Sequence, residues 1–299
     1  MSIEVLGEVS GLGYGLAVLA SLLVFPLLVA WLGVRGPIRR EVEAQASLLM
    51  MTGLAAAMLW LVMPSLLYAF VLDSSTATTQ PSPATTSPSV SLTGAQRAWL
   101  SATVPLLPLL MMVSVFFSSP ARVQGLGLRQ ADFGRGAAIG IGALLVILPL
   151  VWSMSAITLV LWESLGYTHP RAHDLLVTYH DDKSDRLTRS VVWFAAVGAG
   201  ALFEELLFRG CLQTALSSAL RRHWTGLERL ARWAAIILVS LVFALVHPWW
   251  TQPIIFALSL AIGWVYERTG NLWAAIIAHA AFNATSTLIS IYTPQPTSA

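Results

Sequence analysis

Long uncharged runs recur along the first half of the chain and predict helices that cross a membrane. Four such runs lie at residues 9–34, 44–72, 98–121 and 136–162. Each reaches the roughly 20 residues that a helix needs to span the hydrocarbon core of a bilayer. The first run is too long for a cleavable signal peptide, and acidic rather than basic residues precede it.

The second half of the chain adds four more predicted helices. Residues 190–203 are apolar and run directly into two glutamates, and the apolar pattern resumes after Arg209. Residues 233–266 contain no Asp, Glu, Lys or Arg, which leaves room for two crossings with a break at 247–253. A last segment covers about 272–291. The pattern therefore predicts an all-α fold, a polytopic membrane bundle of about eight transmembrane helices.

The predicted helices fall into two groups of four. Residues 1–162 hold the first four, interrupted by a loop at 73–95 that contains twelve Ser or Thr and three Pro. Such a low-complexity segment has little apolar surface to bury. Residues 163–299 hold the last four helices, and in them lie the polar residues that suggest chemistry. We therefore expect the second group to carry the function.

Composition excludes several classes of protein. Hydrophobic residues make up 56% of the chain and charged residues 11%, against about 25% in an average globular protein. A cytosolic enzyme and a disordered protein are both excluded on that ground. A net charge of +2 gives no reason to expect a nucleic-acid partner. The single cysteine, Cys211, excludes an intramolecular disulfide and a cysteine-based zinc cluster.

The basic residues predict the orientation in the membrane. Eleven lie in the loops that follow the first, third, fifth and seventh predicted helices, and five lie on the opposite side. By the positive-inside rule the eleven are cytoplasmic, so both termini face away from the cytoplasm. The chain has sixteen Arg and one Lys, a usage typical of bacteria with GC-rich genomes. We therefore predict a multi-pass protein of a bacterial cytoplasmic (inner) membrane, with the lipid bilayer as its surroundings.

Three charged residues lie inside the fifth predicted helix. Insertion scales assign about 2.5–3.5 kcal/mol to a charge at the bilayer centre, so three unpaired charges would cost about 7–10 kcal/mol. Glu205 and Arg209 are four residues apart on a helix and can pair, whereas Glu204 points about 140° away from Arg209. One carboxylate is thus neutralised and the other is left free. The alternative is an interhelical ion pair that only fixes the bundle.

Further polar residues lie on two other predicted helices. The sixth helix ends at His247, and His279 and Asn283 share one face of the eighth. A carboxylate beside imidazoles is a plausible general base, and Asn and His can donate hydrogen bonds to an oxyanion. A histidine in a membrane helix is often only a hydrogen-bonded core residue. Under the predicted topology Glu204 lies toward the cytoplasmic side and His247 toward the outer side. Either the 247–253 connection turns within the protein at membrane depth, or one of the predicted helix boundaries is wrong.

These residues carry a resemblance to a known family. The segments EELLFRG, FALVH, LWAAIIAHAAFN and GWVYERTGNLW resemble motifs of the CPBP family, which comprises CAAX prenyl endopeptidases and bacteriocin-processing enzymes, the glutamic-type intramembrane proteases. They occupy Glu204–Gly210, Phe243–His247, Leu272–Asn283 and Gly263–Trp273. The resemblance is specific over residues of about 170–285. It implies an eight-helix membrane domain and a peptidase that cleaves a membrane-associated protein or peptide with glutamate-activated water.

The resemblance also implies a role for each motif residue. Four residues are implied to be catalytic, namely Glu204, His247, His279 and Asn283. Glu204 matches the glutamate that activates water and His247 the histidine that shares this task, while His279 and Asn283 match the groups that stabilise the oxyanion. Three further residues are implied to support them, namely Glu205, Arg209 and Phe243. Phe243 is expected to pack beneath His247.

Other assignments remain open at this point. Intramembrane acids and histidines are also typical of a proton-relay transporter, and a non-catalytic bacteriocin-immunity scaffold is a third class. The reaction as implied needs no cofactor, but Glu204, His247 and His279 can also be arranged as zinc ligands. Within residues 171–189, His173, Asp174, His180, Asp181 and Asp182 suggest either a metal site or an amphipathic interfacial segment. The substrate and the oligomeric state are not readable from the sequence.

Overall fold

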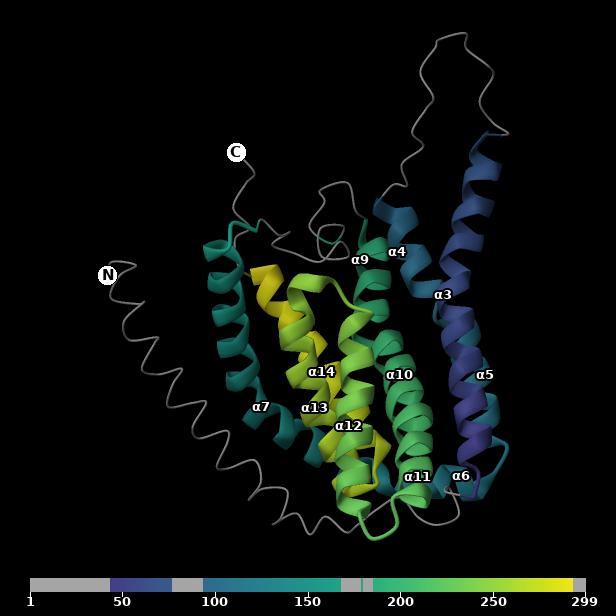
Figure 1. The fold of residues 1–299 in the computed structure, drawn as a ribbon. Helices are drawn as coiled ribbons and strands as arrows, with labels where there is room; N and C mark the ends of the chain where they lie inside the picture. Colours follow the sequence, from purple (N-terminus) through teal and green to yellow (C-terminus); the bar gives the residue numbers. More distant parts are fainter. Residues whose placement is uncertain (1–43, 77–93, 168–178, 180–184, 293–299) are drawn as a thin grey trace.

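Every regular element in the described part of the chain is a helix. The computed structural model describes residues 44–76, 94–167, 179 and 185–292, and no strand occurs among them (Figure 1). The predicted all-α class is therefore confirmed for these residues. The first predicted helix, at 9–34, lies outside them.

The helices pack side by side as a bundle (Figure 1). In chain order they are α3 (Ala46–Thr76), α4 (Gly94–Thr103), α5 (Leu106–Phe117), α6 (Pro120–Gly125), α7 (Gln130–Ser164), α9 (Arg186–Trp193), η1 (Phe194–Ala199), α10 (Gly200–Glu205), η2 (Leu206–Gln213), α11 (Thr214–His223), α12 (Glu228–Leu245), η3 (Trp249–Thr251), α13 (Gln252–Thr269) and α14 (Leu272–Tyr292). Most of the predicted helices are present in the structure, but they begin and end at other residues than predicted.

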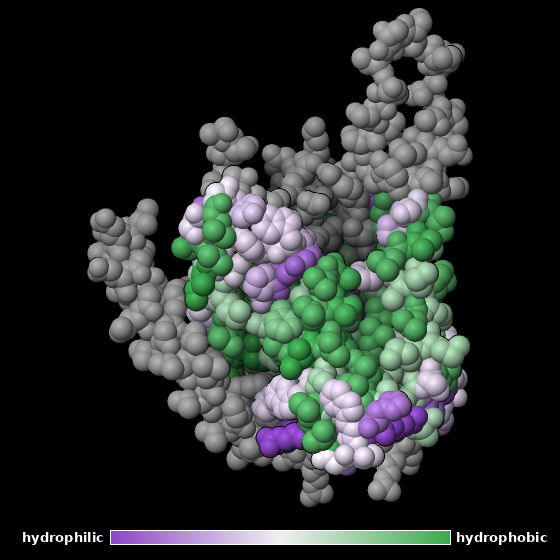
Figure 2. Space-filling view, in the orientation of Figure 1, coloured by the Kyte–Doolittle hydropathy of each residue, from purple (hydrophilic) through white to green (hydrophobic). Residues whose placement is uncertain are grey.

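Four stretches of the described chain are long and apolar enough to cross a membrane. They are Ala46–Leu67, Pro120–Ser164, Arg186–His223 and Leu272–Ile289. The outward surface of the bundle is apolar, with residues such as Met51 and Met58 more than 60% exposed. Figure 2 shows this surface as a hydrophobic belt with hydrophilic residues gathered at its lower end. The structure thus supports a membrane protein, while the predicted number of about eight crossings is not confirmed.

The third predicted crossing, at 98–121, is not one helix. It divides into α4 and α5, with a turn at Val104 and Pro105 between them. Proline has no backbone N–H to donate into a preceding turn, and it disfavours helical geometry at the residue before it. The prediction of one continuous helix was wrong, because the hydropathy of an uncharged run does not show where a helix breaks. α5 keeps only 12 residues and packs against α3.

A single long rod carries the acidic motif. α9, η1, α10, η2 and α11 follow one another without a break from Arg186 to His223. Asp185 caps the start by accepting a hydrogen bond from the Thr188 backbone N–H at 2.7 Å, and this bond lowers the pKa of Asp185. Two segments of the rod, η1 and η2, are π-helical and flank the one turn and a half that holds Glu204 and Glu205.

The C-terminal end of α12 reaches the centre of that rod. Near the end of α12, the Phe243 ring lies 4.9 Å from the Arg209 guanidinium carbon, and its centroid lies 5.9 Å from that of the His279 ring. After η3, α13 begins with Pro253 in its first turn and runs back along the bundle. It ends at Thr269, and the next residue, Gly270, has a left-handed backbone with φ of +58°. The connection itself has no buried residue in η3, and Trp249 packs against Trp162 of α7 with ring centroids 5.0 Å apart. A turn of this connection at membrane depth stays a prediction.

α7 and α14 pack closely because α7 presents glycines to α14. A Cβ atom on Gly140 would lie 2.6 Å from the carbonyl oxygen of Ala274, and one on Gly136 would lie 2.6 Å from the Cβ of Trp273. Small residues allow two helix backbones to approach in this way. The contact fixes the position of α14, which carries His279. An N-terminal helix thereby holds a residue of the candidate site in place.

This close approach predicts that two glycines of α7 differ in how much an added methyl group changes the stability of the protein. Gly140→Ala should lower the melting temperature of the detergent-purified protein, because the new methyl group meets backbone atoms that cannot move away easily. Gly134→Ala is the matched control, since a Cβ there meets nothing within 4 Å. It should leave the protein unchanged or stabilise it by about 0.5–1 kcal/mol through helix propensity. Equal melting temperatures for both variants would contradict the close packing.

Candidate functional site

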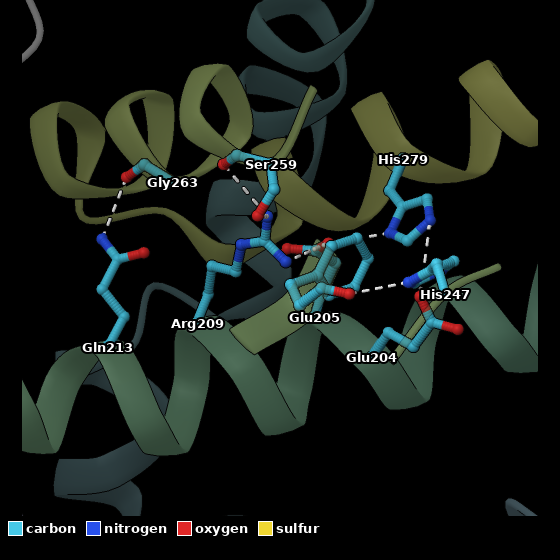
Figure 3. A network of polar contacts seen from close by, with 9 residues as sticks. Glu204, Glu205, Arg209, Gln213, His247, Ser259, Gly263 and His279 are labelled. Atoms are coloured by element: carbon cyan, nitrogen blue, oxygen red, sulfur yellow. Dashed lines mark hydrogen bonds and ion pairs between the residues drawn. The ribbon is translucent and has the colours of Figure 1, made fainter. Parts of the chain in front are cut away.

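A buried ion pair forms the centre of the candidate site (Figure 3). Glu205 Oε1 lies 3.0 Å from Arg209 Nη1, and the two side chains are 0% and 1% exposed. The spacing of four residues predicted this pair. Such a pair in a low-dielectric interior is stable only where further contacts satisfy the remaining polar atoms. The neighbouring helices supply several of these contacts, although Glu205 Oε2 is buried without a hydrogen-bond partner among the described residues.

Arg209 is held from two more sides. Its Nη2 donates to the hydroxyl oxygen of Ser259 at 2.9 Å and to the Ser259 carbonyl oxygen at 3.1 Å. Its guanidinium also lies over the Phe243 ring, where the face of the aromatic ring attracts a cation. Arg209 therefore joins the long rod to both α12 and α13. Sequence reasoning missed Ser259, because nothing in the pattern of α13 indicates which helix it faces.

His279 stands between the two glutamates. Its Nδ1 lies 2.8 Å from Glu205 Oε1, and its Nε2 lies 3.7 Å from Glu204 Oε2. The ring is almost fully buried, and Figure 3 shows it pointing from α14 toward both carboxylates. A carboxylate can only accept, so with Glu205 ionised the Nδ1 atom carries a hydrogen. Glu205 thereby orients the imidazole, as a carboxylate does in many catalytic triads.

Glu204 differs from its neighbour in exposure and in partners. Its side chain is 20% exposed, and its Oε2 lies 3.7 Å from His279 Nε2. That distance is too long for a direct hydrogen bond. The carboxylate is therefore available to a small molecule that reaches it from outside. The predicted separation of roles, with one paired and one available carboxylate, matches this geometry.

His247 lies just beyond the end of α12 with its tautomer fixed. Its Nδ1 lies 2.7 Å from the Phe243 carbonyl oxygen, and that oxygen can only accept. Nδ1 therefore carries the hydrogen, which leaves the lone pair of the neutral ring on Nε2. The expected packing of Phe243 on His247 is present, with ring centroids 4.7 Å apart. His247 is half-buried, and Figure 3 shows it on the same side of the network as Glu204 and His279.

Asn283 reaches the long rod rather than the glutamates. Its Nδ2 donates to the Ala196 carbonyl oxygen at 2.8 Å, within the π-helical segment η1. One of its two amide hydrogens is thus used to attach α14 to η1. The second hydrogen and the carbonyl oxygen remain as possible contacts for a ligand. The sequence placed Asn283 on the face of His279, but it gave no sign of this structural contact.

A second set of polar residues continues away from the glutamates. Gln213 donates to the Gly263 carbonyl oxygen at 3.0 Å and to Glu267 Oε2 at 3.4 Å. Gln213 follows Arg209 by four residues, and Gly263 and Glu267 follow Ser259 at the same interval. Polar contacts therefore form a ladder along η2 and α13. A search for intervals of four residues on the two helices would have found these members, although not their pairing.

No metal cluster is evident in the described ranges 44–76, 94–167 and 185–292. No group of three or more His, Cys, Asp or Glu side chains in them is arranged to hold an ion. The five candidate metal residues between 173 and 182 lie outside the described residues, and whether the protein depends on a metal stays a prediction.

Comparisons with known proteins point to one family. The family model described as type II CAAX prenyl endopeptidase Rce1-like matches residues 186–285. The resemblance to CPBP and CAAX proteases is therefore confirmed, and this segment is an Rce1-like domain. It includes every predicted site residue, from Glu204 on α10 to Asn283 on α14.

A relative from Bacillus subtilis is similar to a shorter stretch of the chain. The uncharacterized protein YpbD of Bacillus subtilis (strain 168) is 35% identical over 79 residues, which is 26% of this chain and 35% of the relative. The alignment thus spans about a third of the relative's length. No solved structure matches the chain.

The buried pair predicts that Arg209 is needed for folding. Arg209→Ala leaves Glu205 as an uncompensated buried charge, which typically costs about 3–5 kcal/mol, so the melting temperature should fall clearly. The matched control is Arg222→Ala, which removes an exposed arginine of α11 and should melt like wild type. Replacing Glu205 by Gln and Arg209 by Met together should recover part of the lost stability. An Arg209→Ala protein as stable as the control would mean that the pair contributes nothing.

Proposed function

We propose that the protein is an intramembrane peptidase that hydrolyses a peptide bond in a membrane-associated protein or peptide. The match of residues 186–285 to CAAX prenyl endopeptidases supports a protease of the CAAX type. One observation carries the proposal. Two adjacent glutamates meet one histidine, and Arg209 neutralises Glu205 while Glu204 stays available at 20% exposure.

In the proposed reaction Glu204 acts as the general base. A water molecule between Glu204 and the substrate gives a proton to the carboxylate as its oxygen attacks the peptide carbonyl carbon. His247 shares the task, because its Nε2 lone pair can accept a hydrogen bond from the same water. When the tetrahedral intermediate collapses, the C–N bond breaks and the proton passes to the leaving nitrogen. The products are a new carboxylate and a new amine.

His279 and Asn283 are proposed to stabilise the oxyanion. In its doubly protonated form His279 still donates Nδ1–H to Glu205, and Nε2–H points toward the carboxylate and the bound substrate. The second amide hydrogen of Asn283 is available beside it. Preorganised donors in a site that excludes bulk water stabilise developing charge strongly. Glu205 and Arg209 then serve to orient His279 rather than to react.

The surroundings of the site indicate the class of substrate. The long rod that carries Glu204 is a candidate membrane span, and apolar residues cover the outward faces of the bundle. A substrate that reaches Glu204 therefore approaches through or along the lipid. We propose an arrangement of about eight crossings in a bacterial inner membrane, with helices of residues 163–299 forming the catalytic core and those of 1–162 supporting it.

The first test of this function is Glu204→Gln. The substitution keeps size and hydrogen bonding but removes the base, so proteolysis should fall by at least about 10²–10⁴-fold while the melting temperature stays near that of wild type. The matched control is Glu163→Gln, an exposed glutamate of α7 that should keep full activity. Membranes from isogenic cells with wild type, Glu204→Gln or Glu163→Gln are compared by mass spectrometry for new peptide termini.

Peptides found in this way are then given to the purified proteins. Termini produced by wild type and the control, but not by Glu204→Gln, support the peptidase. Identical termini in all three strains would favour the two non-catalytic alternatives, a proton-relay transporter or an immunity scaffold. Proton uptake into proteoliposomes would separate these two.

The proposed chemistry also predicts independence from metal. Donors on His279 and Asn283 take the place of a Lewis acid, so cleavage should continue at an unchanged rate after treatment with a chelator such as EDTA. Metal content is measured on the same sample by plasma mass spectrometry. Stoichiometric zinc, with activity lost on chelation and restored by zinc, would instead make Glu204, His247 and His279 ligands.

A further inference from the structure

A cavity of about 570 Å³ lies between the start of α12 and the end of α13. Its lining includes Arg229, Arg232, Trp233, Trp264, Glu267 and Arg268. It shares no residue with the glutamate–histidine site and is joined to it only by the polar ladder. None of the roles proposed above uses these side chains. The cavity is therefore a candidate binding site that is separate from the glutamate–histidine site.

The lining carries a surplus of positive charge. Three arginines face two glutamates, Glu228 and Glu267. Glu267 is already engaged, with Gln213 at 3.4 Å and Arg232 at 3.8 Å. The Nε atom of Arg232 is buried and makes no hydrogen bond to any described residue. Arg229 and Arg268 are exposed at the rim, and their guanidinium groups suit the oxygens of a phosphate.

The position of the cavity favours a lipid over a free anion. Arg229 and Arg232 lie near the start of α12 and Arg268 lies in the last turn of α13, at the ends that the positive-inside rule predicts to be cytoplasmic. Tryptophans such as Trp233 and Trp264 are typical of the membrane interface. Hydrophilic residues gather at the lower end of the belt in Figure 2, where α11 ends and α12 begins in Figure 1. A headgroup held here would lie at the level of the surrounding lipid headgroups.

An apolar stripe leads away from the cavity along α12. Trp233, Ile237 and Leu241 follow one another at intervals of four residues, so they share a face, and they are 40%, 45% and 46% exposed. This stripe offers a path for an acyl chain that starts at the arginines. A free phosphate or a soluble anion would gain no binding energy from this apolar surface. Charge and apolar surface together therefore match an amphipathic anion.

We propose that this cavity binds the headgroup of an anionic phospholipid, with an acyl chain lying along the α12 stripe. The phosphate contacts Arg229 and Arg268 at the rim and Arg232 within. Basic pockets between helices on the cytoplasmic side are known to hold such headgroups. The site does not depend on the proposed peptidase activity.

The test measures lipid retention directly. The full chain is purified in a mild non-ionic detergent and titrated with phosphatidylglycerol, phosphatidylcholine or inorganic phosphate at a fixed salt concentration. Native mass spectrometry counts the bound lipid. Arg229→Gln/Arg268→Gln removes two rim charges that take part in no buried pair, and Arg129→Gln/Arg222→Gln removes two exposed charges outside the cavity. Melting temperatures without lipid show that both variants are folded.

Wild type should retain one phosphatidylglycerol in preference to phosphatidylcholine. The cavity variant should bind phosphatidylglycerol about tenfold or more weakly, and the control variant should stay within about twofold of wild type. Equal retention by the two variants would overturn the site, since binding would then reflect net charge alone. Displacement of the lipid by an equal concentration of inorganic phosphate would also overturn it, because the cavity would then hold a simple anion.

Discussion

The burial of a positive and a negative charge next to each other governs the rest of this structure. Glu205 and Arg209 are almost inaccessible to solvent, yet each is expensive to place in a bilayer alone. Their pairing removes most of that cost only if the remaining polar atoms also find partners. Ser259 and the Phe243 ring contact Arg209, and His279 bonds Glu205 Oε1, while Glu205 Oε2 is buried without a hydrogen-bond partner among the described residues. Three other helices are thus held in place by one turn of the long rod.

This requirement explains how two adjacent glutamates come to differ. A shift of one residue turns a side chain by about 100° on a helix, so Glu205 faces the bundle interior when Glu204 faces its accessible side. π-helical segments on both sides of α10 are consistent with a functional turn, because π-bulges occur frequently at such sites. The more buried carboxylate orients the imidazole of His279, and the more exposed one is left for chemistry. Stability and reactivity are thereby assigned to different residues.

The helices before residue 162 also contribute to the site, although no family match covers them. α14 packs against α7 at a distance that only glycine allows, and α3 packs on η2 and α11. The polar ladder extends the network in the other direction, from Arg209 through Gln213 to Glu267. The candidate site is therefore supported on one side by apolar packing and on the other by hydrogen bonds that reach the α12–α13 cavity.

The sequence alone determined what depends on spacing within one helix. Uncharged runs predicted most helices, the interval from Glu205 to Arg209 predicted their pair, and the motifs led to the family. Contacts between helices could not be predicted, because they depend on the tilt and register of neighbours far apart in the chain. Only the tertiary structure placed Ser259 on Arg209 and attached Asn283 to η1. It likewise placed the end of α12 beside Arg209 at the centre of the rod, because hydropathy alone does not show where a helix ends relative to its neighbours.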